Sequence, residues 1–318
     1  MRLLSSAAGC LLTTTLVAAQ AGIEPHRVYR STYADAGGAV VIPGHFDDLD
    51  NLIVQASAAD VLVLGEPLSQ PAAHRLALTI LEGLARRQRD VILALEVFDR
   101  MAQDPLDHFL MGHLTEAELL AAAGLGPRYA TDYKPLVDLA TARMWPVIAT
   151  GAPHALVADI ARDGFRLDRA KNLVAWVAEC SVFDDYFTRF QVARASGRPV
   201  AGIAAQDGPL DLVQAYRAQC LRDETIADRI GLALAHARDK RPLVVSVNGA
   251  FRSDFYGGLA ERIRRRSPGR RLVVVSFVPV PRLGAIASER PVPGSERTTP
   301  EGAVFPRADY VVYFTATP

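Results

Sequence analysis

The sequence predicts an α/β fold in which helices flank a parallel-rich central sheet and a further helical segment forms a cap. From Asp60 onward, short apolar runs rich in Val, Ile and Leu alternate with longer stretches of helical period, the pattern of β-α-β units. The runs are nearly continuous, as expected of strands buried on both faces of a parallel sheet. The chain has 318 residues, half of them hydrophobic, which suits one large domain of this class.

The N-terminal residues are predicted to be a signal peptide and not part of the fold. Arg2 is followed by an apolar stretch from Leu3 to Ala18 and then by Ala19-Gln20-Ala21, the arrangement of a secretory signal with its cleavage site. We therefore expect residues 1–21 to be removed. Residues 22–318 would then form one periplasmic or secreted domain, with a core at about residues 55–280.

A lipid-anchored form is the alternative to soluble export. Ala7-Ala8-Gly9-Cys10 resembles a lipobox, and lipidation there would hold the chain at an envelope membrane. However, only six residues precede this motif, too few for a hydrophobic signal region. The apolar stretch is also too short to span a membrane, which requires ~20 apolar residues. Soluble export is therefore the preferred prediction.

Strands and helices are predicted to alternate through the rest of the chain. The segment after the first strand repeats apolar residues on one side from Ala73 to Leu84, as an amphipathic helix does. Residues 169–236 are too long for a plain crossover and are expected to form the helical cap, with a break at Asp207-Gly208-Pro209. The expected strands are Val61–Gly65, Val91–Leu95, Pro146–Ala149, Leu243–Val247, Leu272–Val278 and Tyr310–Thr315; the other expected helices are Glu116–Ala123, Pro135–Met144 and Ala155–Arg162; Pro291–Pro306 is expected to be an exposed loop.

Composition and missing motifs argue against several functions. The 35 Lys and Arg residues balance the 35 Asp and Glu residues, so no overall positive field would attract nucleic acid. The sequence has no Cys-x-x-Cys, Walker loop or Gly-x-Ser-x-Gly, and His108 and His113 lack the i, i+4 spacing of paired zinc ligands. We expect no metal-ion site. The arginines between Arg262 and Arg271 are interpreted as a solvated helix end and not as an anion site.

Two cysteines, Cys180 and Cys220, remain after removal of the signal. In an oxidising compartment they could form a disulfide. They could equally be two buried thiols in helices, because the sequence does not give the distance between them. Both interpretations remain open.

Polar residues stand where the predicted strands end. Glu66, Glu96 and Asn248 each follow a buried run, with glycine beside Glu66 and Asn248. Ligands of parallel α/β sheets bind outside the carboxyl ends of the strands. Two carboxylates in one cleft can divide into a protonated acid and an ionised base. The equally supported alternative is that Glu66 and Glu96 cap helix N-termini or bind loop amides.

A series of short motifs carries a resemblance to a known family. The motifs run in order through Leu64-Gly65-Glu66, Gln70-Pro71 with His74, Leu93–Phe98, Tyr133–Leu136, Trp145–Ala149 with Ala152-Pro153, Ala161–Gly164, Arg222-Asp223-Glu224, and Asn248-Gly249 with Arg252, Asp254 and Gly257. Together they resemble the ChaN-like haem-binding family. That family belongs to a wider superfamily with erythromycin-esterase-like and TraB-like proteins, in whose hydrolases a Glu and His pair is thought to do the chemistry.

The resemblance implies an extracytoplasmic protein that binds haem as a homodimer around the cofactor. Haem needs an axial donor such as His or Tyr, together with an apolar slot. For each candidate donor the alternative is an ordinary half-buried side chain with its polar tip in water. The candidate cofactor-binding residues are Glu66, His74, Glu96, Tyr133, His154, Asn248 and Tyr256.

The chain also departs from the family pattern. Leu68 and Ser69 stand where the family has His and Asp, and Ala73 and Ala250 take two further histidine positions. His154 stands where the family usually has Arg. Without these histidines, hydrolysis by the superfamily route loses its general base and the pocket becomes more apolar.

Three functional hypotheses follow. The preferred one is binding of haem, or of another hydrophobic small molecule, by a protein whose polar site is degenerate and which is not an enzyme. The second is a divergent ester or amide hydrolase that uses Glu66 and Glu96. The third is an interaction protein that has kept the fold and lost the site.

Overall fold

The computed structural model describes the chain in eleven segments, and the predicted signal peptide with Cys10 lies outside them. Leu68, the predicted break at Asp207-Gly208-Pro209 and most of the predicted Pro291–Pro306 loop also lie outside the described residues. The described residues are 23–31, 33–34, 41–42, 44–67, 69–87, 89–164, 180–197, 211–237, 240–286, 295–298 and 304–316.

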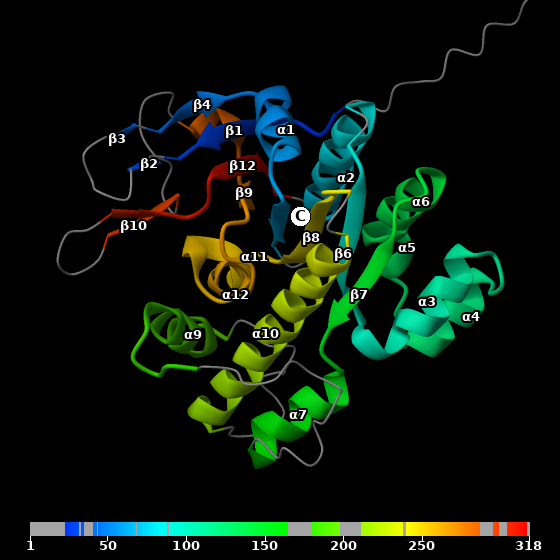
Figure 1. Ribbon diagram of the computed structural model, residues 1–318. Helices are drawn as coiled ribbons and strands as arrows, with labels where there is room; N and C mark the ends of the chain where they lie inside the picture. Colours follow the sequence, from blue (N-terminus) through cyan, green and yellow to red (C-terminus); the bar gives the residue numbers. More distant parts are fainter. Residues whose placement is uncertain are drawn as a thin grey trace, which may run out of the picture.

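The predicted apolar runs become neighbouring strands of one mixed sheet (Figure 1). Its order is β4-β1-β12-β9-β5-β8-β6-β7. The pairs from β12 to β7 are parallel, whereas β1 runs antiparallel to β12 and β4 antiparallel to β1. The strands are β1 (His26–Arg30), β4 (His45–Asp47), β5 (Val61–Glu66), β6 (Val91–Asp99), β7 (Val147–Gly151), β8 (Leu243–Gly249), β9 (Leu272–Val280) and β12 (Tyr310–Thr315).

Two short strand pairs lie outside this sheet. β2 (Tyr33–Ala34) pairs with β3 (Val41–Ile42), and β10 (Glu296–Thr298) pairs with β11 (Val304–Pro306). The second pair falls within the predicted Pro291–Pro306 loop. That prediction is therefore wrong for the strand residues, whose backbone groups are paired in a ladder.

Helices cover both faces of the sheet, as the alternation of side chains along buried strands requires. Leu62 and Leu64 face a core formed with α1 (Leu49–Ser57), α2 (Pro71–Arg86) and α6 (Lys134–Ala142). Val61 and Val63 face α10 (Leu212–His236) and α12 (Leu259–Arg266). The α/β fold class predicted from the sequence is confirmed. The remaining helices are η1 (Arg100–Ala102), α3 (Gln103–Leu110), α4 (Glu116–Ala123), α5 (Tyr129–Asp132), α7 (His154–Asp163), α9 (Asp185–Ala195), α11 (Ala250–Ser253), η2 (Asp254–Tyr256) and η3 (Leu283–Ala285).

The long helix α10 joins the sheet to a helical cap. Its 25 residues extend about 37 Å at 1.5 Å per residue. Because α10 leads into the start of β8, its second half lies along the sheet and its first half extends past the carboxyl edge (Figure 1). There Leu221 packs against α7 and Tyr216 packs against α9. Among the described residues, no helix is both long and apolar enough to cross a membrane.

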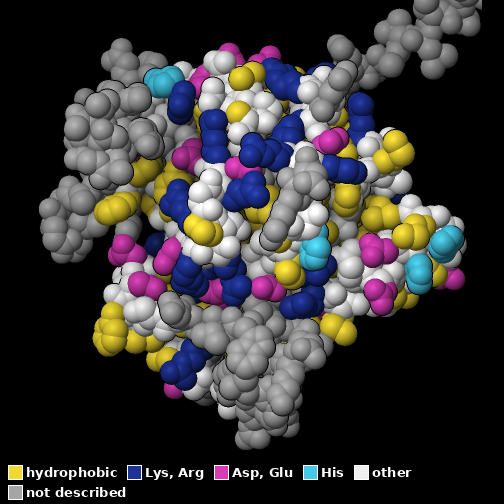
Figure 2. All heavy atoms as spheres, in the orientation of Figure 1, with side chains coloured by type: hydrophobic (Ala, Val, Ile, Leu, Met, Phe, Trp, Pro, Cys, Tyr) yellow, Lys and Arg dark blue, Asp and Glu magenta, His cyan; other side chains and the backbone are white. Residues whose placement is uncertain are grey.

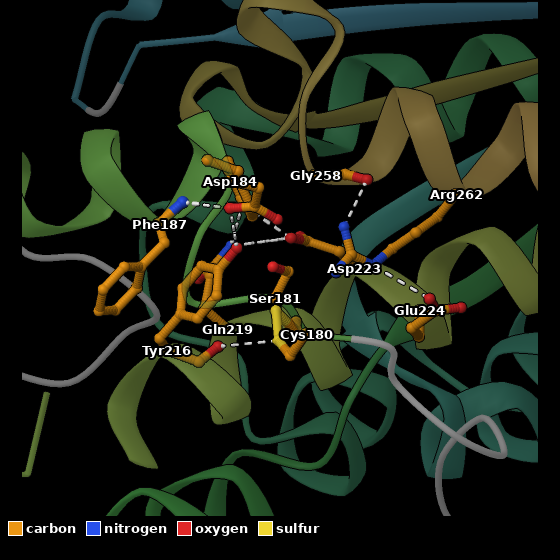
Figure 3. Close-up of a disulfide and its surroundings, with 12 residues drawn as sticks. Cys180, Ser181, Asp184, Phe187, Tyr216, Gln219, Asp223, Glu224, Gly258 and Arg262 are labelled. Carbon is orange, nitrogen blue, oxygen red and sulfur yellow. Dashed lines mark hydrogen bonds and ion pairs between the residues drawn. A yellow bond between two sulfur atoms is a disulfide. The ribbon is translucent and has the colours of Figure 1, made fainter. Parts of the chain in front are cut away.

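A disulfide joins Cys180 to Cys220 and fastens the start of the α9 region to α10 (Figure 3). The two Cα atoms are 6.1 Å apart, within the usual range for a bridged pair. Cys220 is fully buried, whereas Cys180 precedes α9 and is not in a helix. Of the two interpretations of these cysteines, the structure supports the disulfide.

The arginine run at the end of α12 is exposed in part, as the sequence predicts, but three of its members are also ion-paired. Arg262, Arg265 and Arg266 form ion pairs with Glu224 of α10, whose side chain is fully buried. A buried carboxylate requires such partners, because an unpaired charge there would be very costly. Figure 2 shows many Lys and Arg side chains on one face of the molecule, with Asp and Glu side chains close by.

Candidate functional site

Three neighbouring strands carry the predicted site residues at their carboxyl ends. In the register of the sheet, Gly65 is opposite Asn248 and Glu66 is opposite Gly249. On the other side of β8, Leu95 is opposite Val247. Glu66, Asn248 and Glu96 therefore lie close to one edge: Glu66 ends β5, Asn248 is one residue from the end of β8, and Glu96 lies in β6 three residues before its end at Asp99. Their role in binding stays a prediction.

Glu66 lies against His74, and both side chains are only 5% exposed. The chain leaves β5 at Glu66 and begins α2 at Pro71, so the first turn of the helix returns to the strand end. Proline at the first position of α2 has no N–H to leave unbonded and already has a helical φ. His74 Nδ1 is 3.0 Å from Glu66 Oε2.

Asp132 contacts the other side of the same imidazole. His74 Nε2 is 3.5 Å from Asp132 Oδ2, and Asp132 is 2% exposed. Arg128 donates to Asp132 Oδ2 at 2.8 and 3.0 Å, and the Thr131 hydroxyl donates to Oδ1 at 2.9 Å. Glu66, His74 and Asp132 thus form a continuous buried series that ends at Arg128 on the surface.

Sequence reasoning missed Asp132 and Arg128. Their i, i+4 spacing indicates a helical ion pair. It does not indicate that the short helix α5 presents the pair to α2, since that depends on how the two helices pack.

The two carboxylates of this series have opposite pKa shifts. Burial raises the pKa of Glu66; contact with His74 lowers it in part, and the charge of Asp132 raises it further. For Asp132, burial raises the pKa, but hydrogen bonds from Arg128 and Thr131 outweigh it and the pKa is lowered. Glu66 Oε1 has no hydrogen-bond partner among the described residues. Of the two carboxylates of this series, Glu66 is therefore the one more easily protonated or offered to a ligand.

Two arginines bind the Glu96 carboxylate, Arg222 from α10 and Arg252 from α11. Arg252 donates to Glu96 Oε2 at 2.8 Å and to Oε1 at 2.5 Å, and Arg222 donates to Oε1 at 3.1 Å. Burial raises the pKa of Glu96, but the charges of Arg252 and Arg222 outweigh it and lower the pKa to about 2. Glu96 is therefore ionised and its charge is neutralised.

Arg252 also connects Glu96 to residues of the cap. Arg252 Nη1 donates to Asp223 at 2.8 Å, and the Tyr186 hydroxyl donates to the other oxygen of Asp223 at 2.7 Å. Gln219 donates to the Tyr186 oxygen at 2.8 Å. This network lies beside the Cys180–Cys220 disulfide (Figure 3). In the sequence Asp223 and Arg252 supported the resemblance only, and their spacing did not predict a network.

Close backbone packing at the strand edge requires Gly65. A Cβ atom there would lie 2.6 Å from Ser253 Oγ and 3.1 Å from Ala250 Cα. Asn248 is 4% exposed, and its amide donates to the Gly249 carbonyl at 3.1 Å and to Ser253 Oγ at 3.4 Å. Asn248 thus ties α11 to the end of β8.

The remaining predicted donors lie in different surroundings. The half-buried Tyr133 ring is 5.1 Å from the His74 ring, edge to face. Burial raises the pKa of Tyr133, and the charges of Glu66 and Glu96 raise it further. Tyr256 packs with the opposite core, against α10 and α12, and donates to Asp309 at 2.7 Å. The structure therefore does not bring Tyr256 together with His74.

His154 is the first residue of α7, three positions after β7 ends at Gly151. Its side chain is exposed. Burial of part of the ring lowers its pKa; Arg222 and Arg252 lower it further, and Glu96 and Asp99 oppose them. The imidazole is therefore near the Glu96 cluster and mostly neutral at neutral pH.

The two alanines that replace family histidines differ in burial. Ala73 is fully buried in the core between α2 and the sheet, so it does not face the strand edge. Ala250 is half-buried and begins α11 at the end of β8. In the part of the chain that the structure describes, no three His, Cys, Asp or Glu side chains are grouped to hold a metal ion.

A family model described as haem-binding uptake, Tiki superfamily, ChaN matches residues 52–263. Among solved structures, ChaN of Campylobacter jejuni, described as showing cofacial haem binding, is similar with a TM-score of 0.57 and 16% identity; the match covers 91% of this chain and 97% of that one. A mutant of the erythromycin esterase EreC in its open conformation is similar with a TM-score of 0.47 and 12% identity, covering 84% and 93%. A comparison with functionally curated proteins found no match.

Proposed function

Because the chain belongs to the ChaN family of haem-binding uptake proteins within the Tiki superfamily, we propose that it binds haem or a similar flat hydrophobic tetrapyrrole. The binding site would be the carboxyl edge of β5, β8, β6 and β7. The observation that carries this proposal is that the family match, over residues 52–263, includes this whole edge and the cap above it.

The residues at this edge fit a haem group. His154 offers an exposed imidazole and Tyr133 a half-buried phenol, the two donor types named for haem iron. Val97 and Ala250 add half-buried apolar side chains at the ends of β6 and β8. Bound haem would supply the iron and the conjugated ring. The chain would orient the ring. The Glu96 cluster would lie beside the ring, and its charges are already paired with one another.

The mature protein is proposed to act outside the cytoplasm, in the periplasm or as a secreted protein. Within residues 1–21, Arg2 is followed by an apolar stretch, as in a secretory signal, and this supports the proposal. A homodimer around the ligand is part of the proposal because of the family resemblance. Lipidation at Cys10, with attachment to an envelope membrane, is the alternative form.

A divergent hydrolase is the second candidate. The favouring observation is the Glu66–His74–Asp132 series, in which burial raises the pKa of Glu66. Glu96 cannot share the chemistry as a free base, because two arginines hold it ionised and paired. Binding therefore has better support than hydrolysis.

Titration of the purified protein with hemin, followed by its absorption spectrum, tests the proposal. We expect a saturable shift of the Soret band with a definite stoichiometry. Metal-free protoporphyrin, followed by fluorescence, separates binding of the ring from ligation of iron. Absence of saturable binding for both compounds would refute the proposed function, and turnover of simple esters would favour the hydrolase.

A further inference from the structure

The chain's histidines differ in whether their ring nitrogens are available. Of the seven histidines, His74 and His154 follow β5 and β7 at the carboxyl ends of these strands, where the proposed site lies, whereas His26 lies beside the carboxyl end of β12. His74 is 5% exposed, and its nitrogens face Glu66 at 3.0 Å and Asp132 at 3.5 Å. An iron atom could reach His74 only by separating these contacts inside the protein.

His154 has the opposite properties. It is exposed, and its ring shows no hydrogen bond or ion pair to any other described residue. It begins α7 where the chain has just left β7, so the imidazole stands at the strand edge, under the cap. The packing of Leu156 and Val157 against α10 fixes the helix that carries it.

The two tyrosines are weaker donors. The Tyr256 hydroxyl is bonded to Asp309 at 2.7 Å on the other face of the sheet. To bind iron, Tyr133 would have to become a phenolate, and forming an anion there is opposed by burial and by the charges of Glu66 and Glu96. A neutral imidazole adds no charge to an edge that already holds these two carboxylates.

We propose that a ring nitrogen of His154 holds the iron of the bound tetrapyrrole, an inference that rests on the proposed haem binding. The ring nitrogen would supply its lone pair to the iron, with no change in the oxidation state of the iron. The neutral imidazole is the form that binds metal.

The charged groups around His154 come from several elements. Glu96 and Asp99 belong to β6, Arg222 to α10 and Arg252 to α11. Arg222 and Arg252 are paired with Glu96, and Arg252 also with Asp223. These pairs lower the local net charge, so a neutral donor and an apolar ring are compatible with this part of the edge.

Hemin titration of His154→Ala, His74→Ala and His236→Ala tests the assignment. His236 is a matched control, because it is an exposed helical histidine in the last turn of α10, at the opposite end of the sheet. We expect His154→Ala alone to lose the nitrogen-ligand signature in the absorption and electron paramagnetic resonance spectra. Its affinity for hemin should fall by roughly tenfold or more, an easily resolved change, with metal-free protoporphyrin binding unchanged.

Chemical rescue gives a second measurement that a merely structural role would not produce. Free imidazole added to His154→Gly should restore the spectrum of the unchanged protein by occupying the vacated position. An unchanged spectrum in His154→Ala, or loss of the signature in His74→Ala or Tyr133→Phe instead, would overturn the assignment and leave haem binding intact. If the unchanged protein binds no hemin, the proposed function fails first, and this assignment fails with it.

Discussion

Glu66 and His74 lie 3.0 Å apart, Oε2 to Nδ1, inside the protein, although one ends β5 and the other belongs to the first turn of α2. The contact is isolated from solvent, since each side chain is 5% exposed. Asp132 and Arg128 extend it to the surface from α5. The carboxyl edge thus contains a buried titratable series separate from the arginine cluster around Glu96.

Replacing Glu66 by Gln is expected to stabilise the protein increasingly as the pH rises above about 4.5, the ordinary pKa of a glutamate. The pKa of Glu66 is raised in the folded state, so the folded protein holds a proton that the unfolded chain releases. The stability that this proton contributes is fully present below the pKa that Glu66 has in the unfolded chain. It is lost as the pH rises through the higher pKa that Glu66 has in the folded protein. Gln has no proton to lose and avoids this cost.

Thermal unfolding of both proteins between pH 4 and 8 measures the difference. A difference in melting temperature that stays constant over this range would show that Glu66 does not titrate with a raised pKa. Asp138→Asn, a change of an exposed carboxylate on α6, controls for the loss of one negative charge.

Glu96→Gln is expected to destabilise the protein at neutral pH. The pKa of Glu96 falls from 4.5 to about 2 on folding, which corresponds to about 3 kcal/mol of stability as an upper estimate. This contribution is present above pH 4.5 and is lost as the pH falls through about 2. The loss should be large because Arg222 and Arg252 would remain buried after losing their contacts with this carboxylate.

Urea unfolding at pH 7 and at pH 3 checks this expectation. The destabilisation by Glu96→Gln should shrink at the lower pH. Equal destabilisation at both values would contradict the ion-pair explanation and indicate a packing defect instead.

Opening the Cys180–Cys220 disulfide is expected to lower stability and to loosen α9. The bond closes a loop with a sequence separation of 40, worth about 4 kcal/mol by the loop-entropy model. The double variant Cys180→Ala with Cys220→Ala should melt at a lower temperature in the absence of reductant. Adding reductant should destabilise the unchanged protein and leave the double variant unaffected. If reductant changes both proteins equally, its effect does not come from this bond.

The sequence predicted the fold more completely than the site. Continuous apolar runs such as Leu243–Val247 indicate strands because burial on both faces leaves a direct signal in composition. The position of Glu66 and Glu96 at strand ends follows from the same reasoning. The contacts of these residues do not, because Arg222 and Arg252 reach Glu96 from α10 and α11, and only tertiary packing brings those elements together.

The partners of buried polar residues could not be predicted from the sequence. Glu224 lies in a helix whose pattern gives no sign that three arginines of α12 surround it. Similarly, Tyr256 follows the right strand for a site residue, but its hydroxyl is directed to Asp309. Strand order alone does not say on which face a loop side chain lies.

Restoring two of the absent histidines should have different effects. Ala73→His is expected to destabilise the protein by about 3 kcal/mol or more, because Ala73 is fully buried in the core and an imidazole there would overpack it and lack polar partners. Ala250→His should cost less, since Ala250 is half-buried at the edge, and it should increase binding of hemin or of a transition-metal ion. Melting temperatures and hemin titrations of the two variants provide the comparison. Equal stability loss would show that the edge at Ala250 is as tightly packed as the core.

Simple esters and lactones are expected to be hydrolysed no faster than in buffer alone. A hydrolase needs a base near its operating pH, which an imidazole supplies with little tuning. Ala250 and Leu68 supply no imidazole, and the imidazole of His74 is enclosed between Glu66 and Asp132. The imidazole of His154 is exposed, but it has no hydrogen bond to another described residue that would orient it as a base. Glu96 is ionised but paired with two arginines, so it is a poor proton acceptor.

Burial raises the pKa of Glu66 toward a useful range, which makes it the one carboxylate of the pair able to act. Turnover of an ester series by the unchanged protein, with loss of turnover in Glu66→Gln and its retention in Asp138→Asn, would show that the edge is catalytic and would replace the binding function with the hydrolase.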